Sequence, residues 1–206
     1  MKFQFFLLFF LPVVFCQTCD YMNSRIGQDL WGEQVNDYFG YERMLSISGD
    51  GQRLASGSET DNQLINSGHF RAYEYNGTAW GQIGSTIDRN ISNEQCGTVS
   101  LSNNGSIVAF GCRYAKGSIT SISRYVEVYQ YNETEWNPMG SAIVSPSNAS
   151  NFGSSLSLSN DGTRLAVGAY MNNDIYDKQG YVQVYELSTF SQIGGNITGT
   201  DWTVSA

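Results

Sequence analysis

The chain contains two sequence blocks that each occur three times at a nearly constant spacing. The first block alternates serine with apolar residues and lies at residues 45–57, 99–111 and 156–168. The second block is rich in tyrosine and lies at residues 69–75, 125–131 and 181–187. Three of its tyrosines are 56 residues apart, namely Tyr73, Tyr129 and Tyr185. A repeat of this period indicates a fold of stacked supersecondary units, because one unit alone cannot bury its apolar side chains.

Each repeat is predicted to form four short strands. In the third copy, leucine and serine alternate over residues 155–159, and an Asn-Asp-Gly turn leads into residues 164–169. Residues 181–187 are apolar on both faces, and residues 191–197 supply the fourth strand. A strand that is apolar on both faces belongs to a sheet covered on both sides. We therefore expect a β-propeller, whose blades pack on each other; a β-sandwich is the alternative, although sandwiches do not usually repeat at a fixed period.

Three motifs resemble a known family. The pair Phe152-Gly153, the run Val167-Gly168-Ala169 and the strand Tyr181 to Tyr185 resemble FG-GAP repeats, which form the seven-bladed propeller at the N-terminus of integrin α subunits. Similar repeats form long arrays in secreted proteins of algae, other protists and bacteria. The resemblance covers residues 39 to about 206. It implies an all-β fold: a partial β-propeller of about three four-stranded blades, integrin α N-terminal-like, with incomplete ends.

The resemblance does not extend to a calcium site. Calcium-binding FG-GAP blades join their first two strands by a loop dense in Asp and Asn, whereas here the connections are the turns at residues 49–51, 103–105 and 160–162. One carboxylate or none in each turn cannot supply the roughly six to eight oxygen ligands of Ca²⁺. The cluster Asn172-Asn173-Asp174 with Asp177 matches no calcium loop either. We expect no metal and no cofactor.

The two ends of the chain match parts of a repeat. Residues 17–38 form an N-terminal segment in which Arg25–Leu30 resembles Gln82–Ile87, and this indicates one remnant strand of a further blade. The repeats span residues 39–94, 95–151 and 152–198, and a fourth begins at 199–206. Three blades fall below the typical four to eight. This favours a fragment of a longer protein, and the alternative is a partial propeller that associates with itself through open blade edges.

The N-terminus and the composition indicate secretion. Residues 1–16 combine one lysine with a short apolar run and resemble a cleaved signal peptide; the alternative is a membrane anchor, for which the run is too short. After cleavage we expect no membrane insertion. Asn104 begins a sequon in a tight turn, where it is a poor acceptor. The glycosylation candidates are Asn76, Asn90, Asn132, Asn148 and Asn196.

The cysteines fit an oxidising compartment. If residues 103–105 form a three-residue hairpin loop, Ser102 faces Ser106, and counting outward places Cys96 opposite Cys112. Opposed residues on antiparallel strands lie within reach of a disulfide, so we expect this bond rather than two free thiols. Cys19 has no assigned partner.

The loops that join the second and third strands of each repeat differ in length and charge, although the strands repeat. In propellers these loops and the connections between blades share one rim, which is commonly the binding face. For any single residue, drift in an unconstrained loop is the alternative reading. The candidate binding residues are Glu59, Asp61, Arg113, Lys116, Tyr170, Asp174 and Asp177.

The sequence contains no catalytic motif that we recognise. The single histidine, His69, begins a strand and fits a packing role, and we recognise no Ser-His-Asp set or phosphate loop. The net charge of −8 with dispersed basic residues argues against nucleic acid. We expect a non-catalytic, secreted scaffold for extracellular recognition of a protein or glycan. The alternatives are part of a propeller enzyme, a lyase or hydrolase with its catalytic residues in other blades, and a structural wall or matrix protein.

Overall fold

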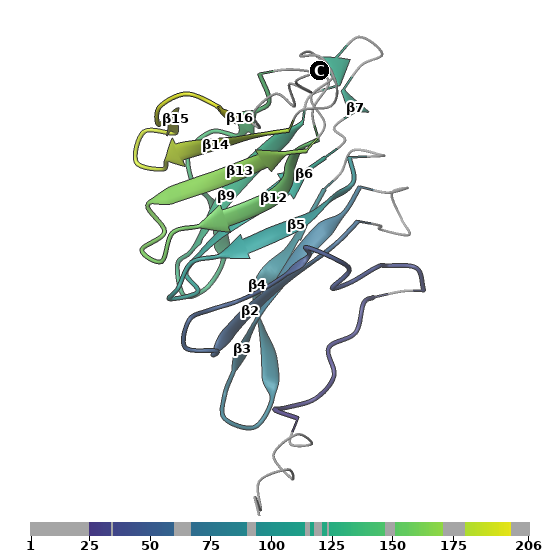
Figure 1. The fold of residues 1–206 in the computed structure, drawn as a ribbon. Coiled ribbons are helices and arrows are strands. Elements are labelled where there is room, and N and C mark those ends of the chain that lie inside the picture. The colour runs from purple at the N-terminus through teal and green to yellow at the C-terminus, as the bar shows by residue number, and fades with distance from the viewer. Residues whose placement is uncertain are drawn as a thin grey trace, which may run out of the picture.

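The computed structural model describes residues 25–33, 35–59, 67–89, 94–113, 116–117, 121–122, 124–146, 151–170 and 180–198. Within these residues every regular element is a β-strand, and three antiparallel sheets follow one another along the chain (Figure 1). The expected all-β fold with three successive blades is confirmed. No helix in this part of the chain is long and apolar enough to cross a membrane.

Each blade takes its strands from one sequence repeat. Blade 1 has the strand order β1 (Leu45–Ile47), β2 (Arg53–Ser58), β3 (His69–Tyr75) and β4 (Trp80–Asp88). Blade 2 contains β5 (Cys96–Leu101), β6 (Ile107–Cys112), β9 (Tyr125–Tyr131), β10 (Trp136–Pro138) and β11 (Ile143–Val144), the last two both pairing with β9. Blade 3 contains β12 (Phe152–Leu158), β13 (Arg164–Ala169), β14 (Tyr181–Glu186), β15 (Ser191–Gln192) and β16 (Ile197–Thr198), the last two both pairing with β14. A two-stranded ribbon of β7 (Lys116–Gly117) and β8 (Ser121–Ile122) extends from blade 2.

The blades stack through their first strands. β5 lies across β1 and β2 of blade 1, and β12 lies across β5 and β6 of blade 2 (Figure 1). We call the face of a blade that turns toward the preceding blade its leading face, and the opposite face its trailing face. One apolar core joins the leading face of blade 2, with Val99 and Phe110, to the trailing face of blade 1, with Ala55 and Phe70. A second core lies between blades 2 and 3 in the same way.

The hairpin between β5 and β6 departs from the expected register. Leu101 pairs with Val108, so the loop is one residue longer than the three-residue loop that the sequence suggested, and Ser102 faces Ile107 rather than Ser106. Cys96 nevertheless pairs with Cys112, because a β-bulge between Cys96 and Thr98 shifts the register back by one residue. The disulfide between these two cysteines is present and fully buried.

A tryptophan and a glycine lock the outer edges of neighbouring blades. The indole Nε1 of Trp136 in blade 2 donates to the carbonyl oxygen of Ile83 in blade 1 at 3.1 Å. Its ring covers Gly84, which has a φ of +67° and where a Cβ would lie 2.7 Å from the indole Cδ1. Only glycine combines this close approach with a positive φ at low cost.

The N-terminal segment repeats this lock without forming a strand. Trp80 donates to the carbonyl oxygen of Ile26 at 3.1 Å, and its ring covers Gly27, which has a φ of +73°. Residues 25–30 were expected as a strand, but they have no strand assignment because no neighbouring strand pairs with them among the described residues. These residues contact blade 1 in the same way as β4, the outer strand of blade 1, contacts blade 2.

Replacement of Trp136 tests the lock. The Trp136→Ala variant should lose about 3–5 kcal/mol of unfolding free energy, because the ring is 5% exposed and packs edge-on against Phe70. The matched control is Trp31→Ala, whose side chain is 76% exposed and whose loss should change stability by about 0.5 kcal/mol or less. Urea unfolding followed by circular dichroism measures both, and equal stability losses in the two variants would contradict the lock.

Candidate functional site

The loops that vary between repeats leave the blades at one edge. We call this edge the loop-bearing rim: β2, β6 and β13 end there, and β3, β9 and β14 begin there (Figure 1). Of the sequence candidates, Glu59, Arg113 and Tyr170 lie here among the described residues. Asp61, Asp174, Asp177 and the sequons at Asn90 and Asn148 lie outside the described residues, as does the side chain of Lys116.

Two of the predicted rim residues form an ion pair. The Arg113 guanidinium of blade 2 contacts the Glu59 carboxylate of blade 1, and both side chains are mostly buried. These residues occupy equivalent positions in successive repeats, each directly after the second strand. Equivalent positions in adjacent blades lie near each other, so the opposite charges of these two residues already indicate a pair in the sequence. The pair neutralises both charges and links blades 1 and 2 at the rim.

A buried polar cluster lies next to this ion pair and was not predicted. Arg89, at the exit of blade 1, pairs with Glu127 at 2.8 Å and with Glu94 at 3.3 Å. The Tyr125 hydroxyl donates to Glu94 at 3.0 Å, and the Tyr129 hydroxyl donates to Glu127 at 2.6 Å. Glu94 is 1% exposed, so this carboxylate depends on its partners for the hydrogen bonds that water would otherwise provide.

The electrostatics of the cluster keep its phenols protonated. Burial raises the pKa of Tyr125 and of Tyr129 well above the ordinary value of a tyrosine. At neutral pH both hydroxyls therefore donate to carboxylates, while Arg89 supplies the positive charge. The members of the cluster hydrogen-bond to each other across the boundary, so the cluster fastens blade 1 to blade 2.

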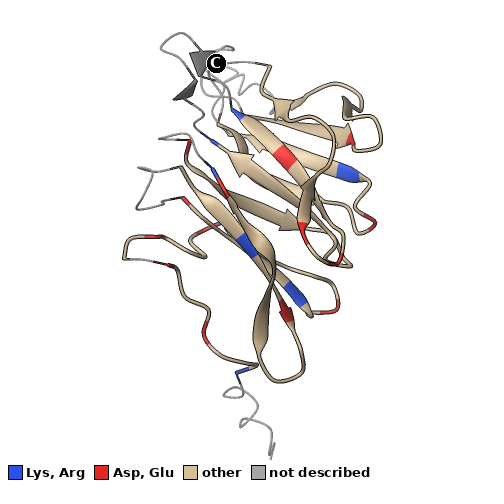
Figure 2. Ribbon diagram, turned by 180° about the vertical axis from the view of Figure 1, so that it is seen from behind, with Lys and Arg blue, Asp and Glu red and all other residues tan. Residues whose placement is uncertain are grey.

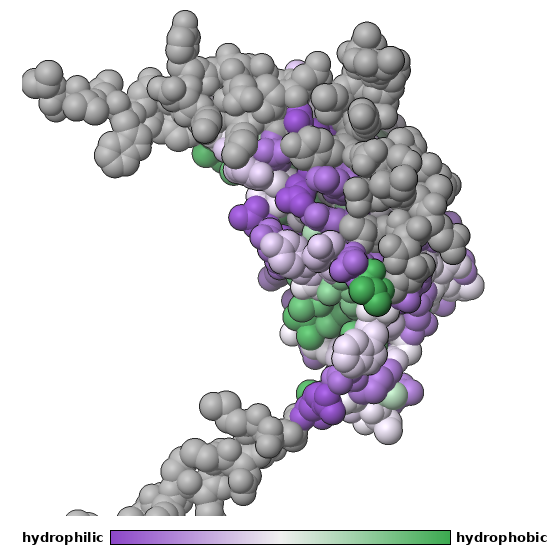
Figure 3. All heavy atoms as spheres, turned by 90° about the vertical axis from the view of Figure 1, so that its right-hand side faces the viewer, coloured by the Kyte–Doolittle hydropathy of each residue, from purple (hydrophilic) through white to green (hydrophobic). Residues whose placement is uncertain are grey.

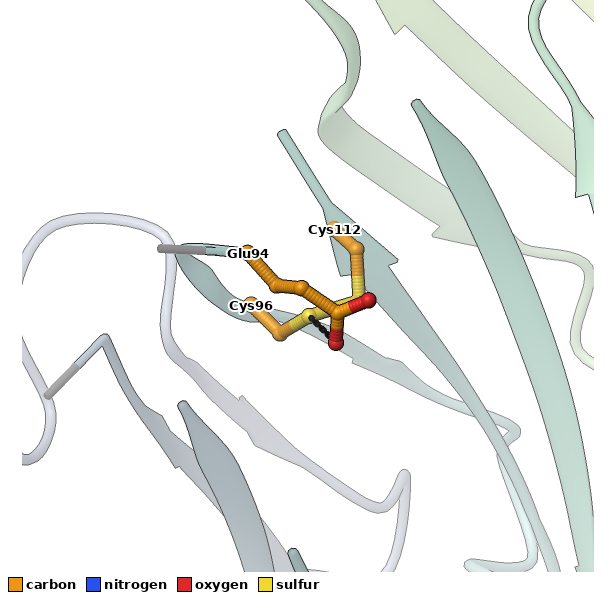
Figure 4. Close-up of side chains that lie close together, drawn as sticks. All are labelled: Glu94, Cys96 and Cys112. Atoms are coloured by element: carbon orange, nitrogen blue, oxygen red, sulfur yellow. Dashed lines mark hydrogen bonds between the residues drawn. A yellow bond between two sulfur atoms is a disulfide. The ribbon is translucent and has the colours of Figure 1, made fainter. Parts of the chain in front are cut away.

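The disulfide lies beside this cluster. Glu94 is next to the bonded sulfurs of Cys96 and Cys112 (Figure 4), and the possible ligand atoms of the three residues lie within 4.8 Å of one another. Zinc and similar metals bind thiolate, which a disulfide does not provide. We therefore assign these residues a covalent and hydrogen-bonded role in blade 2 rather than a metal site.

A serine, a histidine and an aspartate also lie close together in blade 1, but their hydrogen bonds differ from those of a catalytic triad. Ser58 and His69 are cross-strand neighbours, and the Ser58 hydroxyl donates to the Asp37 carboxylate at 2.6 Å. In a hydrolytic triad the serine hydroxyl instead donates to the histidine, and the carboxylate holds the other ring nitrogen. All three residues are buried, and the Nε2 atom of His69 has no hydrogen-bond partner among the described residues. This arrangement agrees with the packing role predicted for His69.

Each third strand carries a polar residue at the same position on its leading face, buried in blades 1 and 3 and partly buried in blade 2. In blade 1 this is Arg71, which lies 3.7 Å from Glu33 and 3.9 Å from Asp37 of the N-terminal segment. In blade 2 it is Glu127, which pairs with Arg89. In blade 3 it is Gln183, whose amide nitrogen donates to Asn196 at 2.8 Å. The charge at this position is therefore different at each blade boundary.

Three of the predicted glycosylation sites lie in the described residues, and their asparagines Asn76, Asn132 and Asn196 are exposed.

The aspartates in the turns after the first strands hold those turns. On the rim opposite the loop-bearing rim, the Ser159 hydroxyl and the main-chain N–H of Thr163 donate to Asp161 and lower its pKa to about 2. Asp50 holds the equivalent turn of blade 1 in the same way, so these two aspartates are turn residues rather than a carboxylate pair. Basic residues lie singly along the strands in the view of Figure 2.

Tyr170 borders a groove on blade 3. The groove has a volume of about 370 Å³, and Tyr170 is 49% exposed at its rim end. Its floor is the trailing face of the blade, with Gly168 and Val182. A second hollow of about 190 Å³ continues along the same face past Ser157 and Ala166.

Comparisons with known proteins support the fold alone. No protein-family model matches the sequence, and no curated protein resembles it in sequence. A chain of the complex of KlAtg21 with the coiled-coil of AgAtg16 matches with a TM-score of 0.54 and 15% identity, over 77% of this chain and 43% of that one. The described residues form part of a β-propeller.

Two further solved structures give weaker matches. The β-propeller domain of the Trilobed protease from Pyrococcus furiosus has a TM-score of 0.49 and 9% identity, over 77% of this chain and 42% of that one. The tricorn protease has a TM-score of 0.43 and 9% identity, over 72% of this chain and 18% of that one. The chain spans less than half the length of each structure that it matches here.

Removal of Arg89 tests the buried cluster. The Arg89→Met variant leaves the buried Glu94 carboxylate without its counter-charge, so we expect a loss of about 3–5 kcal/mol of unfolding free energy. The control is Arg25→Met, which removes an exposed ion pair with Asp29 and should cost about 1 kcal/mol or less. Chemical denaturation measures both values. A loss for Arg89→Met no larger than the control would show that the cluster does not hold the blades together.

Proposed function

We propose that the chain is a secreted, non-catalytic β-propeller scaffold that recognises an extracellular protein or glycan through its loop-bearing rim. One observation carries the proposal: the loops that differ between repeats leave the blades at a single edge, while the strands and their contacts repeat. A constant frame that presents unlike loops on one side is how such scaffolds build binding sites. The resemblance of the strands to FG-GAP repeats supports the same reading.

The setting of the cysteines and sequons supports an extracellular location. The Cys96–Cys112 disulfide is of a kind that persists in oxidising compartments. The described sequon residues are exposed, as glycan attachment requires, and residues 1–16 resemble a signal peptide.

Secretion is tested by expressing the full chain in a eukaryotic secretory host. We expect protein in the medium that begins at Gln17, loses mass on treatment with an N-glycosidase, and yields linked Cys96 and Cys112 peptides without reduction. A chain retained in the cytosol with both cysteines free to alkylate would contradict the extracellular assignment.

Recognition at the rim is tested with immobilised panels of glycans and extracellular matrix proteins. Any ligand that binds the wild type should bind Tyr170→Ala at least about tenfold more weakly, because exposed tyrosines often dominate binding energy. The control is Ser188→Ala, an exposed position in the turn after β14 on the opposite rim. Equal binding by both variants would remove the Tyr170 region from the site, and no binding to any panel member by the wild type would count against the proposed function.

A further inference from the structure

Neighbouring blades share a hydrogen bond that occurs twice. The main-chain N–H of Leu101 in blade 2 donates to the Ser46 hydroxyl oxygen of blade 1 at 3.0 Å. The N–H of Leu158 in blade 3 donates to the Ser100 hydroxyl oxygen of blade 2, also at 3.0 Å. The first strand of each blade therefore offers an N–H on its leading side and a serine oxygen on its trailing side.

The turns after the first strands form a second repeated contact. The N–H of Gly49 donates to the carbonyl oxygen of Asn103 at 2.8 Å, and the N–H of Asn103 donates to the carbonyl oxygen of Asn160 at 3.1 Å. These residues occupy equivalent positions in the three repeats. At both boundaries, therefore, an N–H in the turn of one blade donates to a carbonyl oxygen in the turn of the following blade.

The packing between blades is equally directional. The second strand of each blade carries alanine and glycine on the trailing face, and glycine allows the main chain of the next blade to approach. A Cβ on Gly57 would lie 1.9 Å from the carbonyl oxygen of Gly97, and one on Gly111 would lie 2.4 Å from that of Gly153. Leading faces carry large aliphatic residues. In blade 2 two of these are buried against blade 1, namely Val99 and Leu101.

Among the described residues, the two outer faces of the array hold the halves of these contacts that have no partner. The trailing face of blade 3 presents the Ser157 hydroxyl, the Asn160 N–H and the groove beside Gly168, with Val182 37% exposed. The leading face of blade 1 is the complementary surface. It presents the Ile47 N–H, the Gly49 carbonyl oxygen and two aliphatic side chains that are more than half exposed, Leu45 and Ile47. Hydrophobic residues also gather in a patch with polar surroundings on the side seen in Figure 3.

We propose that the trailing face of blade 3 binds the leading face of blade 1 in a second copy of this chain. The contact continues the established interface between blades: Ser157 accepts from Ile47 of the second copy, Asn160 donates to Gly49, and the aliphatic side chains fill the groove beside Gly168. Two copies form two identical contacts related by a two-fold axis. In such a ring, the described blades of two copies number six, which lies within the range of about four to eight that propellers adopt.

Closure of the ring exchanges the lock on Trp80. In each copy Ile26-Gly27 covers this tryptophan, and the side chain of Gln28 holds the segment through two hydrogen bonds with the Trp80 main chain, at 2.7 and 2.9 Å. At the other end, Gly194 has a φ of +68°, close to the values at the other locks, but no atom of the described residues lies within 4 Å of its Cβ position. In the ring, Ile193-Gly194 of one copy replaces Ile26-Gly27 on Trp80 of the other.

Light scattering and sedimentation equilibrium on the full secreted chain test the ring. The wild type should form a discrete dimer. The variants Ile47→Arg and Val182→Arg should each weaken association at least tenfold, and because both positions are exposed, the fold should survive. The matched control is Val144→Arg, which is 53% exposed on the outer edge of blade 2 and should remain dimeric.

Mixing distinguishes this contact from a symmetric pairing of like faces. Ile47→Arg retains a normal trailing face and Val182→Arg a normal leading face, so an equimolar mixture should form heterodimers through one intact contact. A monomeric wild type at about 100 μM would overturn the proposal, and so would loss of dimers in one variant with none in the other.

The exchange at Trp80 has its own readout. Gln28→Ala removes the two hydrogen bonds that hold the competing segment and leaves Leu45, Ile47 and Val182 of the docking faces unchanged, so this variant should dimerise several-fold more tightly than the wild type. Unchanged or weaker association would show that residues 25–30 do not compete for Trp80, and would overturn this part of the proposal.

Discussion

The structure depends on the close approach of main chains between successive blades. At Gly57 and Gly111 the main chain of the next blade lies so close that no side chain would fit. This close approach brings the serine oxygen of one first strand within hydrogen-bond distance of an N–H in the first strand of the next blade. The large aliphatic side chains of each leading face then fill the surface that the small residues leave open. Neither face is buried by its own sheet, so the apolar residues of one blade contribute to stability only when a neighbour is present.

The outer locks depend on the same geometry. Trp136 can cover Gly84 only if the inner strands have already set the distance between blades 1 and 2. The ion pair and the buried cluster near the loop-bearing rim add polar contacts to this packing. Their members come from both blades, so they require the blades to be correctly stacked before they can form, and they make that stacking specific.

The features that recur in each repeat could be predicted from the sequence, whereas those found in a single blade could not. The spacing of the tyrosine blocks was sufficient for the strands and their order, because a strand that recurs with the same alternation has the same neighbours in each copy. The Cys96–Cys112 pairing was predicted from a hairpin register that was wrong by one residue, and a bulge that nothing in the sequence had marked restored it. Arg89 and Glu94 could not be foreseen as a pair with Glu127, because the connection that holds them differs in sequence from the one between blades 2 and 3.

The charge on the third strand has a consequence for how this array can change. Arg71 meets carboxylates and Glu127 meets a guanidinium, although the two residues hold the same place in their blades. If blade 1 stood where blade 2 stands, Arg71 would face Arg89, and two cations would share a buried boundary. The shapes of the blades are therefore interchangeable, but their order is not. The boundary between blades 1 and 2 is specific in charge, so a duplicated repeat must change this one position before it can be accommodated there.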